Sequence, residues 1–204
     1  MASIYDLKPA FQRLLRPIVG AFARRGITAN QVTVAACILS ILTGVLIFNA
    51  GAAHPRVLLL LPVVMFLRMA LNAIDGMLAR EYAMKSALGG FLNELTDVVS
   101  DVALYLPMAV IPGLNSFLVV LFVLAAVISE MTGVVAVAQG ASRRYDGPMG
   151  KSDRAFVIGT LGLLLGVGMR ASSWVNLVFV IALVLTVLTI VNRVRSGLRE
   201  IATN

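Results

Sequence analysis

Hydrophobic residues gather in long runs along most of this chain, and short polar stretches separate the runs. Each run has about 18 to 25 residues, the length that an α-helix needs to cross the roughly 30 Å hydrocarbon core of a bilayer. The breaks between them contain glycine, proline, serine or charged residues, which are typical of turns. The pattern predicts an all-α polytopic membrane protein with transmembrane helices at residues 29–49, 57–80, 87–111, 114–138, 154–170 and 173–194.

The first 26 residues have a different pattern, in which apolar residues recur at spacings of three and four with basic residues between them. Leu7, Phe11, Leu15 and Ile18 illustrate this spacing, and Tyr5 belongs to the same apolar set. It is typical of an amphipathic helix that lies in the plane of the membrane interface, and a solvated leader is the alternative. We expect a single domain over residues 1–204, with an interfacial helix in 1–26 and a six-helix bundle in 29–194.

The composition supports a place in the membrane. Of the 204 residues, 59% are hydrophobic and only 13% are charged, and the mean hydropathy is +0.93. Such a chain cannot present an ordinary polar surface to water. The formal net charge of +7 therefore favours anionic lipid head groups over nucleic acid as the neighbour of its basic residues. The single cysteine, Cys37, lies in an apolar run and is expected to be a small buried hydrophobe.

The distribution of basic residues predicts the orientation of the chain. Fourteen of the 17 lysines and arginines fall on one side of the predicted spans. By the positive-inside rule, both termini and the loops at 80–86 and 142–153 are cytoplasmic, in a protein of the cell inner membrane. Arg193 and Arg195, at the end of the last span, are expected at the interface.

Polar side chains cluster within the second and third predicted spans. Charged residues at bilayer depth are costly, so those that occur usually face a cavity or a site. Asn72 and Asp75 lie three residues apart on one face of the second span. Carboxylates brought together without matching histidines suit Mg²⁺ or Mn²⁺, and a structural network or a proton path is the alternative. On the third span, an arc of roughly 100° contains Asn93, Glu94, Asp97 and Asp101.

The same residues form a motif. Asn72-Ala-Ile-Asp75-Gly76-Met-Leu-Ala79-Arg80 is followed at fixed spacing by Gly89, Asn93 and Asp97. This stretch resembles the signature of the CDP-alcohol phosphatidyltransferases, D-x2-D-G-x2-A-R-x8-G-x3-D-x3-D, and every spacing is kept. The start of the first span, Thr28-Ala-Asn30-Gln-Val-Thr33, is similar to the T-P-N-x-x-T of many members.

The resemblance implies an enzyme in which an alcohol hydroxyl attacks the β-phosphorus of a CDP-linked lipid, typically CDP-diacylglycerol, and releases CMP. It implies that Asp75 is a metal ligand for Mg²⁺ or Mn²⁺ and that Asp97 is the catalytic general base. It also implies a homodimer among membrane lipids, and it leaves the alcohol acceptor open. The residues expected to bind the CDP group are Asn30, Thr33, Asn72, Gly76, Ala79, Arg80 and Gly89.

Two departures from the family pattern change the expected metal site, because Asn72 and Asn93 stand where the family has its first and third acids. An amide oxygen can bind Mg²⁺ but brings no negative charge. Glu94 and Asp101 lie on the same face of the third span and would restore that charge. The expected ligands are therefore Asp75, Glu94, Asp97 and Asp101, with Asn72 and Asn93 as neutral ligands or substrate contacts. The alternatives are a single metal, a member that binds CDP-lipid without turnover, or a cation transporter.

A second polar cluster lies in the loop that precedes the fifth predicted span. It resembles the G-x-x-x-K-x-D-R segment of several family members, and its cations are expected to bind a phosphate of the acceptor. Contact with anionic lipid is the equal alternative. Glu130, an acid within the fourth span, is a candidate partner for one of these cations. The predicted acceptor-binding residues are Arg143, Arg144, Lys151 and Arg154.

The shifted ligand set can be tested by replacing Glu94 and Asp101 singly with alanine. If these carboxylates supply the charge that Asn72 and Asn93 lack, each variant lowers metal-dependent turnover. The measurement is the initial rate against metal concentration. Full activity in both variants would reject the shifted set.

Overall fold

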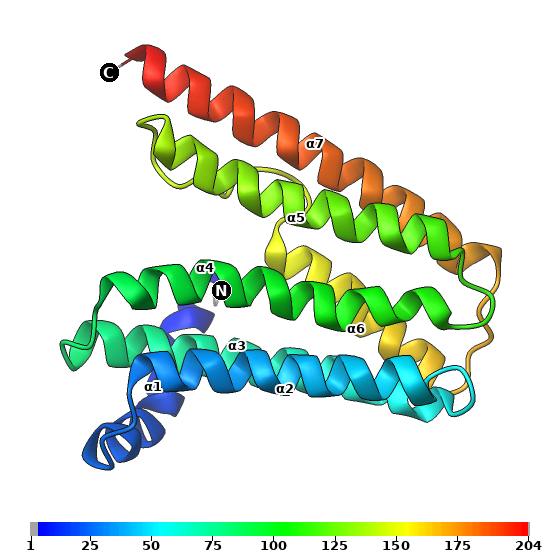
Figure 1. The fold of residues 1–204 in the computed structure, drawn as a ribbon, viewed down its shortest axis with the longest axis horizontal. Coiled ribbons are helices and arrows are strands. Elements are labelled where there is room, and N and C mark those ends of the chain that lie inside the picture. Colours follow the sequence, from blue (N-terminus) through cyan, green and yellow to red (C-terminus); the bar gives the residue numbers. More distant parts are fainter. Residues whose placement is uncertain (1–3, 204) are drawn as a thin grey trace. The chain divides into compact units, whose positions relative to one another are not determined.

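The computed structural model describes the backbone of residues 4–203 and the side chains of residues 10–203, and it is helical throughout its regular structure (Figure 1). The all-α prediction is confirmed. The interfacial segment forms a helix, although the side chains of Tyr5 and Leu7 lie outside the described part. The helices are α1 (Ile4–Arg24), α2 (Ala29–Ala50), α3 (Leu60–Glu81), α4 (Ala87–Tyr105), α5 (Ser116–Ala138), α6 (Lys151–Gly166) and α7 (Ser173–Thr203), with 3-10 helices η1 (Pro55–Leu59) and η2 (Leu106–Val110).

Four segments of the described chain are long and apolar enough to cross a membrane. Two predicted spans, α4 and α6, do not meet this description. The 19-residue α4 contains three acidic residues, and α6 has only 16 residues. The membrane fold is therefore confirmed, and the count of six spans stays a prediction. The four segments are Ala29–Ala50, Pro55–Glu81, Ser116–Ala138 and Ser173–Thr203.

Several helices end or begin at residues other than those predicted, because of individual residues near their ends. The third span was expected to reach residue 111, but α4 ends at Tyr105 because Pro107 cannot continue its hydrogen bonds, and η2 follows. α6 begins earlier than expected, because the carboxylate of Asp153 accepts a 2.9 Å hydrogen bond from the N–H of Gly150. It ends before Gly168, which has a φ of +104°.

The chain divides into two compact units, and the first comprises residues 1–41 and 63–100. Its apolar core brings α1, the start of α2 and the last half of α3 together around Leu15, Val32 and Met77. Arg16 of α1 donates hydrogen bonds of 3.1 and 3.3 Å to the carboxylate of Glu81, at the end of α3. This contact between exposed side chains orients α1 on the end of α3, although its contribution to stability is small.

The second unit comprises residues 42–62 and 101–204, and within it α5 and α7 lie side by side (Figure 1). The ring of Phe122 packs between those of Tyr105 and Phe179, at centroid distances of 6.0 and 5.7 Å. Gly162 and Gly166 let α6 approach the residues around η1, because a side chain at either glycine would touch them. Small residues that permit such close packing are typical of membrane helices.

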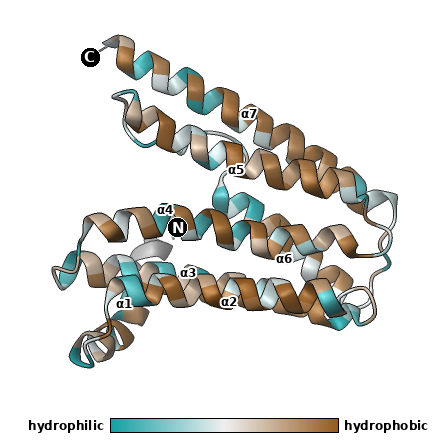
Figure 2. Cartoon of the chain, viewed as in Figure 1, coloured by the Kyte–Doolittle hydropathy of each residue, from teal (hydrophilic) through white to brown (hydrophobic). Residues whose placement is uncertain are grey.

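Large hydrophobic side chains remain exposed on the helices of both units. Leu42, Phe117 and Leu177 are examples, each more than half exposed. Hydrophobic residues, coloured brown, make up much of the ribbons of α2 and α5 in Figure 2. A protein in water rarely presents apolar surface of this extent. These side chains are therefore suited to contact lipid.

Gly44 offers a test of the packing in the second unit. A Cβ atom at this position would collide with the backbone carbonyl of Ala103 in α4. We expect Gly44→Ala to lower the free energy of unfolding by about 1–3 kcal/mol, the usual cost of overpacking. Thermal unfolding in detergent measures this change. Gly90→Ala in α4 is the control, because nothing lies within 4 Å of its Cβ position, and equal melting temperatures for the two variants would contradict the packing described here.

Candidate functional site

The first unit brings the motif residues of α2, α3 and α4 together in pairs. Asp75 of α3 is buried, at 6% exposure. The hydroxyl of Thr33 lies 2.7 Å from one carboxylate oxygen of Asp75, and 3.1 Å from the backbone carbonyl of Ala29. Because a hydrogen bond to a charged acceptor is the stronger one, the hydroxyl proton favours Asp75. Thr33, predicted to bind the CDP group, therefore also orients the predicted metal ligand.

The second pair joins α3 to α4. The side-chain amide of Asn72 donates a 3.2 Å hydrogen bond to Oδ1 of Asp97. A guanidinium nitrogen of Arg68, which is buried at 5% exposure, lies 3.7 Å from the same oxygen. The donor and the cation both contact Oδ1 and so orient the carboxylate of Asp97, the predicted general base. The asparagine in the place of the family's first acid thus contacts the predicted base.

Two of the predicted CDP-binding glycines also lie against polar side chains. A Cβ at Gly89 would be 2.8 Å from the amide oxygen of Asn30, so the start of α4 can approach the start of α2 only because this residue is glycine. A Cβ at Gly76 would be 3.2 Å from the guanidinium of Arg80, whose side chain bends back along α3. Ala79 packs at the edge of the apolar core of this unit.

The other predicted metal ligands differ in exposure and in the unit to which they belong. Asn93 is exposed and Glu94 is half-buried on α4. Asp101 is buried and belongs to the second unit, where one carboxylate oxygen lies 4.0 Å from a guanidinium nitrogen of Arg154. In the part of the chain that the structure describes, no three side chains of His, Cys, Asp or Glu form a group that could hold a metal ion.

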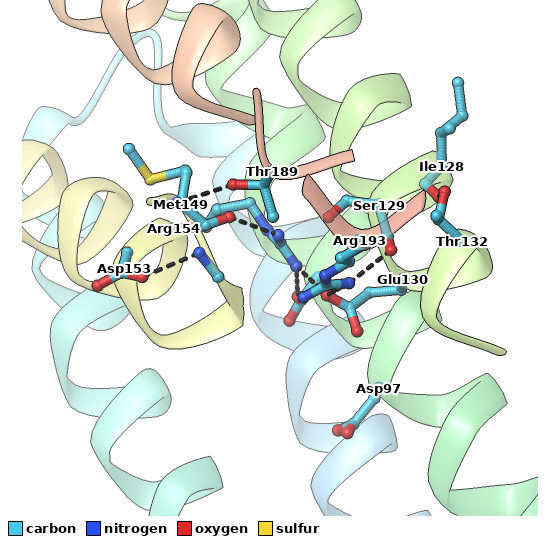
Figure 3. Close-up of polar contacts among 12 residues, drawn as sticks. Asp97, Ile128, Ser129, Glu130, Thr132, Met149, Asp153, Arg154, Thr189 and Arg193 are labelled. Atoms are coloured by element: carbon cyan, nitrogen blue, oxygen red, sulfur yellow. Dashed lines mark hydrogen bonds and ion pairs between the residues drawn. The ribbon is translucent and has the colours of Figure 1, made fainter. Parts of the chain in front are cut away.

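In the second unit, the predicted acceptor-binding arginines divide into two groups. The first surrounds Glu130 of α5, one carboxylate oxygen of which lies 2.7 Å from Arg154 (Figure 3). The other carboxylate oxygen lies 3.2 Å from Arg143. The proposed partnership of Glu130 with one of these cations is confirmed. Arg143 reaches Glu130 past Gly133, where any side chain would collide with its guanidinium.

The second group fixes the loop between α5 and α6. Arg144 donates hydrogen bonds of 2.8 and 3.0 Å to the carboxylate of Asp146 and one of 2.6 Å to Glu200 of α7. Glu200 also accepts 2.9 Å hydrogen bonds from the N–H and the hydroxyl of Ser142. The hydrogen bonds from Arg144 hold the pKa of Asp146 below its usual value. Arg144 therefore holds the loop in place, whereas Arg143 and Arg154 point to the buried acid.

Arg193 corrects one expectation, since it was assigned to the membrane interface but is buried at 1% exposure. Its guanidinium lies 3.3 Å from Glu130 and donates a hydrogen bond to the backbone carbonyl of Ser129 (Figure 3). A sequence signal existed, because Thr186, Thr189 and Arg193 recur at spacings of three and four and define one polar face of α7. Thr189 of this face accepts a 2.9 Å hydrogen bond from the N–H of Met149.

Comparison with known proteins identifies the family of this chain. The sequence profile of the family described as CDP-alcohol phosphatidyltransferase matches residues 26–191. The chain is 46% identical over 196 residues to the inner membrane protein YnbA of Escherichia coli strain K12, and the alignment covers 96% of both chains. The chain therefore belongs to the CDP-alcohol phosphatidyltransferase family.

The fold is also similar to solved structures of the phosphatidylinositol phosphate synthase PgsA1 of Mycobacterium tuberculosis. The structure with CDP-DAG bound matches with a TM-score of 0.77 at 19% identity, over 91% of this chain and 94% of that chain. The structure with manganese and citrate matches with a TM-score of 0.74 at 19% identity, over 89% and 87%. At this identity the similarity concerns the fold.

The contact between Thr33 and Asp75 can be tested by Thr33→Val, which removes the hydroxyl and leaves the shape nearly unchanged. Loss of a hydrogen bond to a buried carboxylate is expected to lower the stability by about 1–3 kcal/mol. Thermal unfolding of the detergent-solubilised protein measures this, with Thr33→Ser as the control that keeps the donor. In an Asp75→Asn background the same change should cost less, and equal costs in both backgrounds would show that the two side chains are not coupled.

Proposed function

We propose that this protein transfers a phosphatidyl group from a CDP-linked lipid, CDP-diacylglycerol, to an alcohol acceptor and releases CMP, as a step of phospholipid synthesis. The observation that supports this most strongly is the hydrogen bond between Asn72 and Asp97, at 3.2 Å. This hydrogen bond joins the first motif position, on α3, to the last, on α4. It therefore supports a single site built from the motif residues. Membership of the family agrees with this chemistry.

In the proposed reaction, Asp97 acts as the general base. One carboxylate oxygen accepts the proton of the acceptor hydroxyl, and the acceptor oxygen forms a bond to the β-phosphorus of the lipid. The bond between that phosphorus and the bridging oxygen breaks, and CMP leaves with the electron pair. The Asn72 amide and the Arg68 guanidinium would orient Asp97 toward the proton that it accepts.

The chemistry of the donor set fits a divalent cation, Mg²⁺ or Mn²⁺. The side chains that face each other on α3 and α4 offer oxygen donors, the type that both ions prefer. Asp75, Asp97 and the amide oxygen of Asn72 would hold the ion, and Asn93 and Glu94 complete the proposed set in the first unit. Asp101, also expected from the sequence as a ligand, belongs to the second unit. The ion would neutralise the pyrophosphate of the CDP-lipid. Thr33 would keep Asp75 in position for this contact.

Separate groups would bind the two substrates. The CDP group would bind beside Gly89 and Gly76, which lie next to the side chains of Asn30 and Arg80 respectively. Thr33, Asn72 and Ala79 complete the proposed CDP-binding set. In the second unit, the anionic group of the acceptor would meet the arginines around Glu130. Lys151 at the start of α6 would add a further cation, and Arg144 would act by holding the loop.

The proposed setting is the cell inner membrane, with both termini on the cytoplasmic side. The four long apolar helices and the relative named as an inner membrane protein support the location. The orientation rests on the distribution of lysine and arginine. We also propose a homodimer, as the family resemblance implies.

The transfer is tested by incubating the purified full-length protein with CDP-diacylglycerol, Mg²⁺ or Mn²⁺ and a panel of alcohols, and by measuring CMP. Asp97→Asn should lower the rate by about 10²–10⁴-fold, the usual contribution of a general base. Glu81→Gln is the matched control, because it removes a carboxylate whose ion pair is with the exposed side chain of Arg16.

Two outcomes would reject this proposal. Tight binding of CDP-diacylglycerol without CMP release from any alcohol would indicate a member of the family that binds its lipid without turnover, consistent with the missing acids at Asn72 and Asn93. Metal-dependent ion flux without CMP release would indicate a transporter.

A further inference from the structure

Glu130 lies at the centre of a buried arginine cluster in the second unit (Figure 3). Arg143, Arg154 and Arg193 reach it from the α5–α6 loop, from α6 and from α7, at 3.2, 2.7 and 3.3 Å. Arg154 and Arg193 are almost fully buried, at 0% and 1% exposure. One carboxylate thus receives contacts from three cations on three separate segments of the chain.

The cluster retains a capacity to bind an anion. Arginine is always protonated in proteins, so three positive charges surround the carboxylate of Glu130. The buried Nε atoms of Arg154 and Arg193 have no hydrogen-bond partner among the residues that the structure describes. Buried donors of this kind usually have a partner, and an anionic ligand would supply one.

The charge balance limits which anion fits. Among the side chains in contact with one another, three arginines against Glu130 and Asp101, which lies 4.0 Å from Arg154, leave a formal charge of +1. Lys151 of the proposed acceptor site is partly exposed, so water screens its charge more than those of the buried arginines. A group with one negative charge would neutralise this cluster. A phosphate monoester, with nearly two negative charges at neutral pH, would exceed it and would meet the carboxylate of Glu130 at the centre.

We propose that Glu130 is a specificity-determining residue, and that it restricts the arginine cluster to acceptors whose ionic group carries a single negative charge, such as a carboxylate. The proposal rests on the function proposed above, because it assigns the cluster to the acceptor alcohol. Glu130 acts as an internal anion that competes with a phosphate for the same guanidinium groups. It refines the expectation that these arginines bind an acceptor phosphate.

The test compares the binding of inorganic phosphate and formate to the detergent-purified full-length protein by calorimetry, at a pH where phosphate is mostly a dianion. Each anion is measured by binding alone, so the result does not depend on whether the transferase reaction occurs. Glu130→Gln raises the formal charge of the cluster to +2, and we expect the ratio of phosphate affinity to formate affinity to rise about tenfold. Glu81→Gln, which removes an acid from the first unit, should leave the ratio unchanged.

Arg143→Gln provides a second variant in case Glu130→Gln does not fold. It lowers the formal charge to zero while Glu130 keeps its contacts with Arg154 and Arg193, and the ratio should fall below that of the unmodified protein. A ratio that stays constant in a folded variant of either kind would overturn the proposal and leave Glu130 with a purely structural role. If CMP release identifies an acceptor, Glu130→Gln should also shift kcat/KM toward phosphorylated alcohols.

Discussion

The ion pair between Glu130 and Arg154, at 2.7 Å, is the interaction on which the second unit depends. An unpaired charge in the interior of a membrane protein is expensive, and removing one member of such a pair leaves the other uncompensated. Here the acid joins α5 to α6 and, through Arg193, to α7. These helices are otherwise mostly apolar, and apolar contacts within lipid specify a register only weakly. The charged contacts therefore determine how the helices align.

The first unit uses weaker polar contacts for a different purpose. The hydroxyl of Thr33 and the amide of Asn72 each hold one carboxylate, Asp75 and Asp97 respectively. A neutral donor orients an acid without neutralising it. Asp97 also has one cation nearby, the guanidinium of Arg68 at 3.7 Å, whereas Glu130 contacts three arginines. In the proposed function, the first unit would carry the chemistry and the second would bind the acceptor.

Two regular patterns in the sequence predicted much of this arrangement, namely the apolar runs and the spacing of the motif. Apolar runs predicted most helix ends to within a few residues, although α7 continues to Thr203, well beyond the predicted end at 194. The spacing from Asn72 to Asp97 predicted which faces of α3 and α4 would meet. The ends of α4 and α6 were less accessible, because a proline and a capping carboxylate decide them locally. Arg193 was misassigned because charge near the end of a span is ambiguous until the helices that cover it are known. Which arginine holds the loop and which faces Glu130 depends on tertiary contacts.

The short length of α6 has a consequence for the surrounding membrane. Its 16 residues measure about 24 Å, less than the roughly 30 Å of a typical hydrocarbon core. In a chain where α6 spans the bilayer, as the sequence predicts, mismatch of this size would be relieved by local thinning, or by lipid head groups and water that follow the polar end of the helix inward. Lys151 and Arg154 occupy that end, so the thinned region would bring water closer to the depth of the buried arginines. For the transferase proposed above, the short helix would thus shorten the distance between a water-soluble acceptor and the lipid.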